Sequence, residues 1–208
     1  MASTKRIAKE FADCTTAPPP GISITLPSDA DLHTWHVTVT APPNSVYAPG
    51  RFGLILKMPT EYPFKAPTIN FTTRIYHPNI TNDSLGNICL ALLKSENWKP
   101  SSKIINVLEA VRNILVEPMP DDPLEQRIAD EYRRDRPEFE KNARAYVERY
   151  AKGTVNFVQG PDPKEDKSKS NNNDKNSGAG AGAANPGRAA AGRQGGSSGS
   201  SSRPAPPL

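Results

Sequence analysis

The chain has 208 residues and a formal net charge of +4 at pH 7, a length that fits one ordinary domain with an extension or two small domains. From residue 161 onward, seven Lys and Arg stand against four Asp and Glu, which leaves the first 160 residues almost neutral. That neutral part has no block of like charge and no interleaving of basic with aromatic residues, so the composition gives little support for binding nucleic acid.

A helix is expected near the N-terminus. Ser3 or Thr4 can cap it, and it should run to about Cys14. Ile7, Phe11 and Cys14 recur at i, i+4 and i+7, which places them on one apolar stripe. The sequence therefore predicts that Cys14 fills the core.

Alternating apolar and polar residues predict four strands after a Pro-rich stop at 18–21. The alternation runs over 22–26, 34–40 and 52–58, and a shorter stretch follows at 69–71. The links between these stretches are rich in Pro, Gly and Asn and contain no helical pattern. This arrangement favours an antiparallel meander.

Three helical patterns follow the strands. Ser101 or Ser102 is expected to cap the first, whose apolar face extends over 104–115. The run 122–125 has the N-cap, N1 and N3 residues of a capping box and opens the second. The third covers 135–153. The order predicts an α+β fold with an N-terminal helix, a four-stranded antiparallel meander sheet, a catalytic loop and three C-terminal helices.

The cysteines and histidines do not form a disulfide or metal-binding pattern. Two cysteines, Cys14 and Cys89, give no disulfide framework. His33 and His36 stand three residues apart on an extended segment, so their side chains point to opposite faces. We therefore expect no metal site.

Residues 76–89 contain the groups best suited to chemistry. Pro78 lacks a backbone donor and biases His77 away from helix, so this segment should be irregular. Asn79 then carries a side-chain amide on a fixed turn, and the thiol of Cys89 follows a short stretch later. A thiol with an amide donor nearby supplies the nucleophile and the dipole that acyl transfer through a thioester requires. The alternative is a buried, inert thiol.

Several motifs together resemble the ubiquitin-conjugating enzymes over residues 4–152. They stand in that family's order: Tyr62-Pro63-Phe64-Lys65-Ala66-Pro67, His77-Pro78-Asn79, Cys89-Leu90, Trp98-Lys99-Pro100 and Pro120-Asp121-Asp122-Pro123-Leu124. The resemblance implies that Cys89 accepts ubiquitin as a thioester from the ubiquitin-activating enzyme. It further implies transfer to lysines of protein substrates, directly or with a RING- or HECT-type ubiquitin ligase. No cofactor is expected, because ATP is consumed upstream.

Three further residues receive roles from this resemblance. Asn79 either braces its turn or donates to the oxyanion when a lysine amine attacks the Cys89 thioester, and the two roles can coexist. Asp122 either caps a helix or lies near Cys89, where it orients the attacking lysine and helps remove its proton. His77 is expected to be structural, fixing the loop through hydrogen bonds to the backbone.

Three segments are candidate partner surfaces. Basic residues off the apolar stripe of the first helix form either a solvated face or, as the resemblance implies, a docking surface for the activating enzyme and ligases: Lys5, Arg6 and Lys9. The proline-braced loop at 62–67 either turns the chain or anchors a partner. The resemblance implies that this loop and the one after Trp98 form the ligase-binding surface through Pro63, Phe64, Lys99 and Pro100.

Two features near the thiol depart from the family pattern. The run from Asn79 to Cys89 is longer than usual, and Ala91 stands where many members have an aspartate, which should weaken attack by free lysine. Two other functions are possible alternatives, but each accounts for fewer of these residues than the transferase does. One is an inactive variant that only binds ubiquitin or ligases, and the other is a cysteine isopeptidase using Cys89, His77 and Asn79. For the isopeptidase, His77 precedes a proline on the same short loop and is poorly placed to act as the base.

We expect residues 1–153 to form a ubiquitin-conjugating core domain, 154–160 a linker and 161–208 a disordered tail. The tail contains no aromatic residue and consists mainly of Gly, Ala, Ser, Asn and Pro. The sequence shows no signal peptide, no run of roughly 18 apolar residues and no lipidation motif. A cytoplasmic or nuclear protein without membrane contact is therefore expected.

Overall fold

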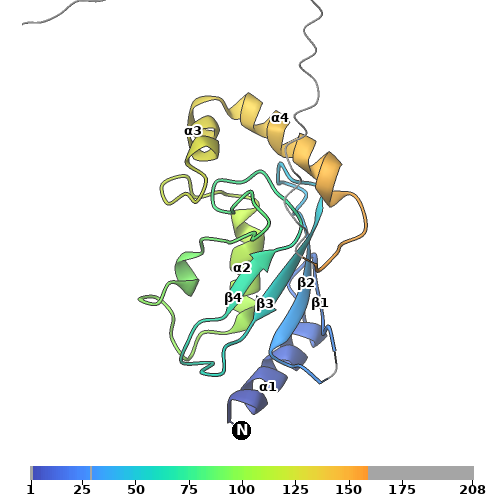
Figure 1. Ribbon diagram of the computed structural model, residues 1–208, viewed down its shortest axis with the longest axis vertical. Helices are drawn as coiled ribbons and strands as arrows, with labels where there is room; N and C mark the ends of the chain where they lie inside the picture. The colour runs from blue at the N-terminus through green and yellow to red at the C-terminus, as the bar shows by residue number, and fades with distance from the viewer. Residues whose placement is uncertain (1, 29, 159–208) are drawn as a thin grey trace, which may run out of the picture. The chain divides into compact units, whose positions relative to one another are not determined.

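The computed structural model describes residues 2–28 and 30–158, with the order helix, four strands, three helices (Figure 1). Their bounds are α1 (Ala2–Thr16), β1 (Ile22–Thr25), β2 (Thr34–Thr40), β3 (Arg51–Lys57), β4 (Thr68–Phe71), α2 (Ile104–Ile114), α3 (Gln126–Arg134) and α4 (Arg136–Tyr146). A 3₁₀ turn, η1 (Ala91–Leu93), lies between β4 and α2, and a π-helical turn, η2 (Val147–Ala151), extends α4. The α+β class and the element order are confirmed. The expected tail at 161–208 lies outside the described residues.

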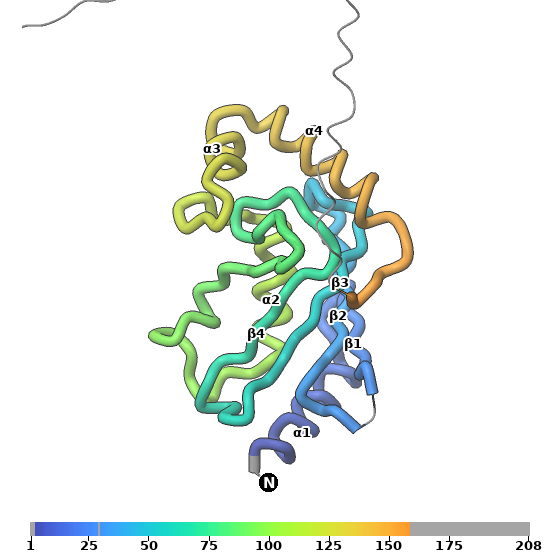
Figure 2. The backbone as a smooth tube through the Cα atoms, in the orientation of Figure 1, coloured from blue at the N-terminus to red at the C-terminus, as the bar shows by residue number. Residues whose placement is uncertain are grey.

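The four strands form one antiparallel sheet in the order β1-β2-β3-β4, which confirms the meander. The register places Ile24, Val37, Leu54 and Phe71 in one row across the sheet. The buried apolar face of α2 belongs to the same core, and α1 packs against α2 and β1. Cys14 on α1 is buried, as its place on the apolar stripe predicts. The pair α3 and α4 lies at the end of the sheet opposite to the start of α1 (Figure 2).

The start of α2 differs from the expectation that Ser101 or Ser102 caps it. The helix begins at Ile104, and the Lys103 side chain makes no capping bond within the described residues. The backbone N–H of Ile104 instead donates to a carboxylate oxygen of Glu10 on α1, at 2.6 Å. An anion from another element thus satisfies a donor at the N-terminus of α2, so no local serine is needed.

The start of α3 also differs from the expectation. The helix begins at Gln126 rather than at Asp122, and the capping box is absent. The reason is that the N–H groups of Leu124 and Glu125 both donate to the carbonyl oxygen of Pro78, each at 2.9 Å. These long-range bonds hold 122–125 as a turn, so the Asp122 carboxylate is not used as a cap.

Residues 154–158, within the expected linker, return along the face of the sheet away from α2. The Phe157 ring stacks on His36 of β2 with 4.2 Å between the ring centroids. Thr72 donates from Oγ1 to a carbonyl oxygen of the segment at 2.6 Å. Gly53 leaves room for it, because a Cβ there would lie 2.5 Å from a side chain of the segment. The sheet and the end of the core are therefore joined by specific contacts.

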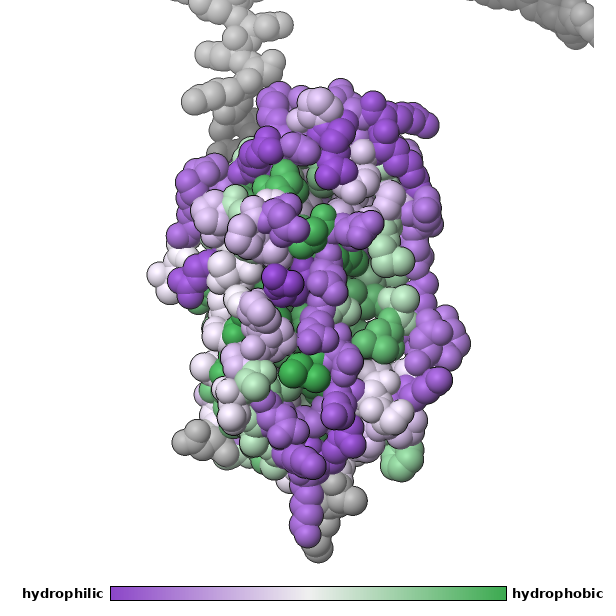
Figure 3. Space-filling view, turned by 180° about the vertical axis from the view of Figure 1, so that it is seen from behind, coloured by the Kyte–Doolittle hydropathy of each residue, from purple (hydrophilic) through white to green (hydrophobic). Residues whose placement is uncertain are grey.

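The surface is mixed in polarity. Seen from behind, hydrophobic residues form small separate groups among hydrophilic ones (Figure 3). The two most exposed large hydrophobic residues of the described part are Phe64, at 80 % exposure, and Val158, at 78 %. Among the helices described, none is long and apolar enough to cross a membrane.

Candidate active site

The loop between Asn79 and Cys89 closes on itself. The backbone N–H of Cys89 donates to the carbonyl oxygen of Asn79 at 2.9 Å, so the two residues meet despite the length of the loop. Inside it, the Asp83 carboxylate accepts the N–H groups of Leu85 and Gly86 at 2.9 and 3.0 Å. Gly86 has φ +57°, and a Cβ there would lie 2.0 Å from the carbonyl oxygen of Phe71. The extra loop length is therefore absorbed in a compact turn.

His77 is completely buried and fixes the start of this loop. Its Nδ1 accepts the Asn79 N–H at 2.9 Å, so Nε2 carries the proton and donates to the carbonyl oxygen of Ile114 at 2.9 Å. Burial lowers the pKa of His77 to about 4, which keeps the ring neutral at pH 7. Since both ring nitrogens bond to the backbone, His77 is not available as the base that an isopeptidase needs.

The Asn79 carboxamide holds the turn 119–122. Its Nδ2 donates to the carbonyl oxygens of Met119 and Asp122 at 2.7 and 3.0 Å. Its Oδ1 accepts the Met119 N–H at 2.8 Å. Both hydrogens of the amide are engaged, and the side chain is buried. This geometry is that of a brace between two loops distant in sequence.

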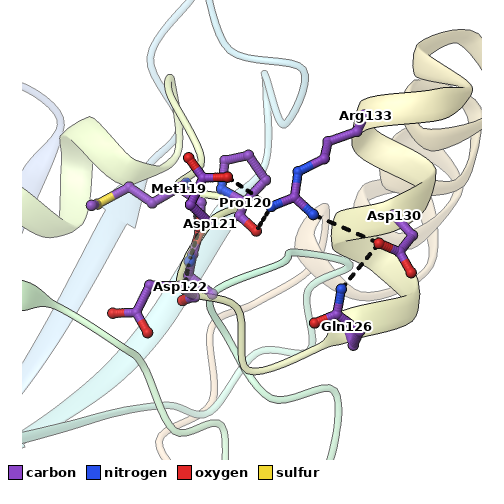
Figure 4. A network of polar contacts seen from close by, with 8 residues as sticks. Met119, Pro120, Asp121, Asp122, Gln126, Asp130 and Arg133 are labelled. Atoms are coloured by element: carbon purple, nitrogen blue, oxygen red, sulfur yellow. Dashed lines mark hydrogen bonds and ion pairs between the residues drawn. The ribbon is translucent and has the colours of Figure 1, made fainter.

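Arg133 holds the same turn from the side of α3 (Figure 4). Its Nη2 donates to the carbonyl oxygen of Pro120 at 2.5 Å and to the Asp121 carboxylate at 2.8 Å. Its Nη1 lies 3.6 Å from the carboxylate of Asp130 on the same helix. Figure 4 shows the Asp122 side chain pointing away from α3. The turn is thus fixed on both sides while the Asp122 carboxylate projects outward.

That carboxylate meets the thiol. Cys89 is partly exposed, and its Sγ lies 3.5 Å from Oδ2 of Asp122. The Lys94 Nζ lies 2.5 Å from the same oxygen. Burial, with the hydrogen bond to Asp122 and its negative charge, raises the pKa of Cys89, and the Lys94 charge opposes this only in part. The hydrogen bond from Lys94 lowers the pKa of Asp122, so this carboxylate is ionised at pH 7. The Cys89 thiol is therefore accessible to solvent but mostly protonated at pH 7.

A groove adjoins this group of residues. Its volume is about 910 Å³, and its wall includes both the segment after Cys89 and the turn that bears Asp122. The residues contributed by these two segments are Leu90, Ala91, Leu92, Met119, Pro120, Asp121 and Asp122. This open groove, lined by both apolar and polar groups, has room for an extended chain and reaches the residue that follows Cys89.

The predicted partner residues gather on another part of the surface. The indole of Trp98 donates to the carbonyl oxygen of Pro63 at 2.7 Å, which ties the loop at 62–67 to the exposed pair Lys99 and Pro100. Phe64 is 80 % exposed on that loop. A depression there is lined by Pro63, Phe64 and Arg6 of α1. Lys5 and Lys9 are exposed on the same helix.

Lys94 and Arg133 are site residues that sequence reasoning missed. Each contacts the turn 119–122 from a different element, and no local spacing indicates either contact. The buried carboxylate of Glu10 was missed as well, because a charged residue in a helix is usually solvated. In the described part of the chain, no group of three or more His, Cys, Asp or Glu side chains could hold a metal ion.

Comparisons with known proteins place the chain in a family. The family model "Ubiquitin-conjugating enzyme" matches residues 6–147. Ubiquitin-conjugating enzyme E2 14 of Schizosaccharomyces pombe is 52% identical over 151 residues, which cover 73% of this chain and 96% of that protein. Ubiquitin conjugating enzyme E2 B of Dictyostelium discoideum is 42% identical over 152 residues, covering 73% of this chain and 100% of that protein.

Proposed function

The chain belongs to the ubiquitin-conjugating enzyme family, and from this premise we propose that Cys89 accepts the C-terminal carboxyl of ubiquitin as a thioester and transfers it to a lysine. One observation carries the proposal above all. The accessible Sγ of Cys89 lies 3.5 Å from an ionised carboxylate, beside a groove that can hold an extended chain end. This combination provides a nucleophile, a guide for an incoming cation and a place for the acyl group.

The raised pKa of the thiol fits exchange between thioesters. A protonated thiol is a weak nucleophile toward ordinary amides and esters. Ubiquitin arrives already joined to the activating enzyme through a thioester. Its transfer to Cys89 needs little driving force, because one thioester bond is broken and another is formed. ATP is then used by the activating enzyme, and this chain needs no cofactor.

Asp122 is suited to guide the acceptor. Its ionised carboxylate lies beside the sulfur, so it attracts the ammonium group of a lysine to the side from which the thioester carbonyl is attacked. Its lowered pKa makes it a weak base. We therefore assign it mainly to orientation, and the lysine proton passes through it or directly to water.

Asn79 supports transfer by holding the turn that bears Asp122. Its carboxamide makes three hydrogen bonds to backbone atoms of that turn. Donation to the oxyanion would require one of its two N–H bonds to open once the thioester forms. The bracing role needs no such rearrangement, and it is the one that the contacts of the uncharged protein support.

The partners follow from the same proposal. We expect the activating enzyme to contact Lys5, Arg6 and Lys9, and RING- or HECT-type ligases to contact the surface around Phe64 and Pro100. The loop at 62–67 and the loop after Trp98 are held together by the hydrogen bond from the Trp98 indole to Pro63, so this surface is a rigid anchor for a partner. Protein substrates present their lysine at Asp122.

Charging of the thiol tests the proposal. The protein is incubated with ubiquitin, activating enzyme and ATP, and samples are run on gels with and without reductant. We expect one adduct that reductant removes in the wild type, no adduct in Cys89→Ala, and a reductant-resistant ester in Cys89→Ser. If no adduct forms under any condition while the protein still binds ubiquitin or a ligase, the chain is an inactive binding variant.

A further inference from the structure

A depression lies between the sheet and the residues that follow η2, on the face of the sheet away from α2. Its volume is about 570 Å³, and three strands together with residues 152–157 form its walls. None of the residues that line it in the described part of the chain is acidic. The cations and hydroxyls on its walls belong to Arg51, Lys152, Ser23, Thr25, Thr38 and Thr154. Positive charges and hydroxyl donors without a carboxylate among them are suited to binding an anion.

Thr38 places a buried hydroxyl on the sheet side of this depression. It alternates with Val37 and Val39, which are buried in the core, and it lies opposite Ser23 of β1. Thr38 is 9% exposed, and its Oγ1 makes no hydrogen bond within the described residues. Buried hydroxyls usually have a partner, because an unpaired polar group that has left water is unfavourable. A ligand that accepts a hydrogen bond at this position would satisfy the Thr38 hydroxyl.

The two cations are available to a ligand. Arg51 is exposed at the start of β3, and its guanidinium forms no ion pair or hydrogen bond in the part of the chain that the structure describes. The Lys152 ammonium lies 2.6 Å from a carboxylate oxygen of Glu148, but these side chains are 50% and 61% accessible. An exposed pair of this kind is weak, so a ligand with a higher negative charge can displace Glu148. A guanidinium can also donate two parallel N–H bonds to phosphate oxygens.

The outer wall of the depression is fixed by the protein itself. The stack of Phe157 on His36 and the hydrogen bond from Thr72 hold the segment 154–158 against the sheet. Val155 and Phe157 line the depression from this segment and add apolar surface. The volume exceeds what a single phosphate group fills. There is therefore room for the chain that carries such a group, with apolar contacts for its carbon atoms.

From these features we infer that the depression binds a phosphorylated side chain, such as phosphoserine, of a partner protein. A phosphoserine carries about −1.5 to −2 charges at pH 7 and three acceptor oxygens. Arg51 and Lys152 match this charge, and the Thr38 hydroxyl donates to one of the oxygens. No covalent step is involved, and the site is separate from the thiol chemistry of Cys89.

A titration of the full chain, labelled with ¹⁵N and followed by NMR, tests the inference. The probes are a short Gly- and Ala-rich peptide with one phosphoserine, the same peptide without phosphate, and inorganic phosphate, all at one ionic strength and pH 7.5. The variants are Arg51→Gln and Thr38→Val. The control is Lys57→Gln, because Lys57 lies on the same strand and the same face of the sheet but does not line the depression.

We expect saturable shifts with the phosphopeptide in β1, in β2 and at 152–157, and none with the peptide that lacks phosphate. Arg51→Gln should weaken binding at least about tenfold, and Lys57→Gln should leave it within about twofold of the wild type. Thr38→Val should weaken binding roughly threefold without lowering the urea midpoint, because the hydroxyl makes no hydrogen bond inside the protein.

Three results would overturn the inference: no saturable shifts, equal binding of the peptide without phosphate, or equal affinities of Arg51→Gln and Lys57→Gln. Inorganic phosphate that binds as tightly as the phosphopeptide would assign the site to the free ion and overturn the assignment to a protein side chain. Charging of Cys89 should be unchanged in Arg51→Gln, so failure of this inference leaves the proposed function intact.

Discussion

His77 links the stability of the active-site loop to pH. Burial lowers its pKa from the ordinary value near 6.5 to about 4, so between these values the unfolded chain binds a proton that the folded protein does not. Its neutral form therefore contributes stability that is fully present above pH 6.5 and is lost as the pH falls toward 4. The expected loss is about 3 kcal/mol.

Urea unfolding between pH 7.5 and pH 4.5 measures this effect. His77→Gln should be less stable at neutral pH, because it lacks the ring, but its stability should fall less steeply on acidification. His36, whose pKa burial also lowers, provides the control: His36→Gln should leave most of the slope unchanged. An equal slope in His77→Gln and wild type would show that His77 is not the group responsible.

The charges around Cys89 set the reactivity of its thiol. Asp122 raises the pKa of this thiol and Lys94 lowers it. At pH 8, Asp122→Asn should therefore react faster with iodoacetamide, and Lys94→Met should react more slowly. Cys14 provides an internal standard, because burial raises its pKa to about 12 and it should stay unmodified in the folded protein. Changes in the same direction for both variants would contradict the assigned charges.

At the level of elements, α3 holds the turn 119–122 through Arg133. The ion pairs of Arg133 are exposed, so Arg133→Ala should change the free energy of unfolding by less than about 1 kcal/mol. Looser placement of Asp122 should nevertheless slow discharge of the Cys89 thioester to free lysine by roughly tenfold. Charging should stay close to the wild-type rate, since it does not need Asp122 to meet a lysine.

Discharge assays on Arg133→Ala, with Arg134→Ala as the matched control on the same helix, separate these effects. The maximal rate should fall in Arg133→Ala at saturating lysine. If only the lysine concentration needed for half-maximal rate changed, Arg133 would act on lysine binding and not through the position of the turn.

The segment 154–158 should act as part of the core domain. The stack of Phe157 on His36 and the bond from Thr72 predict that a chain ending at residue 153 is less stable than one ending at residue 160, by about 1 to 2 kcal/mol. Deleting 161–208 alone should leave both folding and charging intact. Gly53→Ala should resemble the shorter truncation, because its Cβ would displace the segment. Equal urea midpoints for the two truncated chains would contradict this role.

Local patterns in the sequence were enough to predict which segments form helices and which form strands. The strand at 34–40 and the apolar face of α2 follow from simple periodicity, because each buries one face. Helix starts were predicted less well. At the start of α2, the Ile104 N–H donates to Glu10. Just before α3, the two N–H groups of 124–125 donate to the carbonyl oxygen of Pro78. Both acceptors are distant in sequence, so local capping patterns were misleading.

For the whole molecule, sequence reasoning proposed Cys89, Asn79 and Asp122 as site residues but did not predict how they are held together. The contacts that join them run between the loop after β4, the turn before α3 and η1, and none has a characteristic spacing. Lys94 and Arg133 look like ordinary surface charges in the sequence. Their importance comes from what lies next to them in the fold.

One continuous segment connects the candidate active site with the expected ligase surface. From Cys89 the chain passes through η1 and Lys94 to Trp98, which anchors the loop that bears Phe64. The thiol and the expected ligase surface are therefore parts of one continuous, well-bonded segment.

Discharge of purified Cys89 thioester to free lysine tests the central claim most directly. Charging should succeed in the wild type, Asn79→Ala and Asp122→Asn. Discharge of Asn79→Ala should be about 100-fold slower than that of the wild type, because loss of the brace displaces Asp122, and discharge of Asp122→Asn should also be slower. Wild-type discharge rates in both variants would show that the arrangement around the sulfur does not drive transfer.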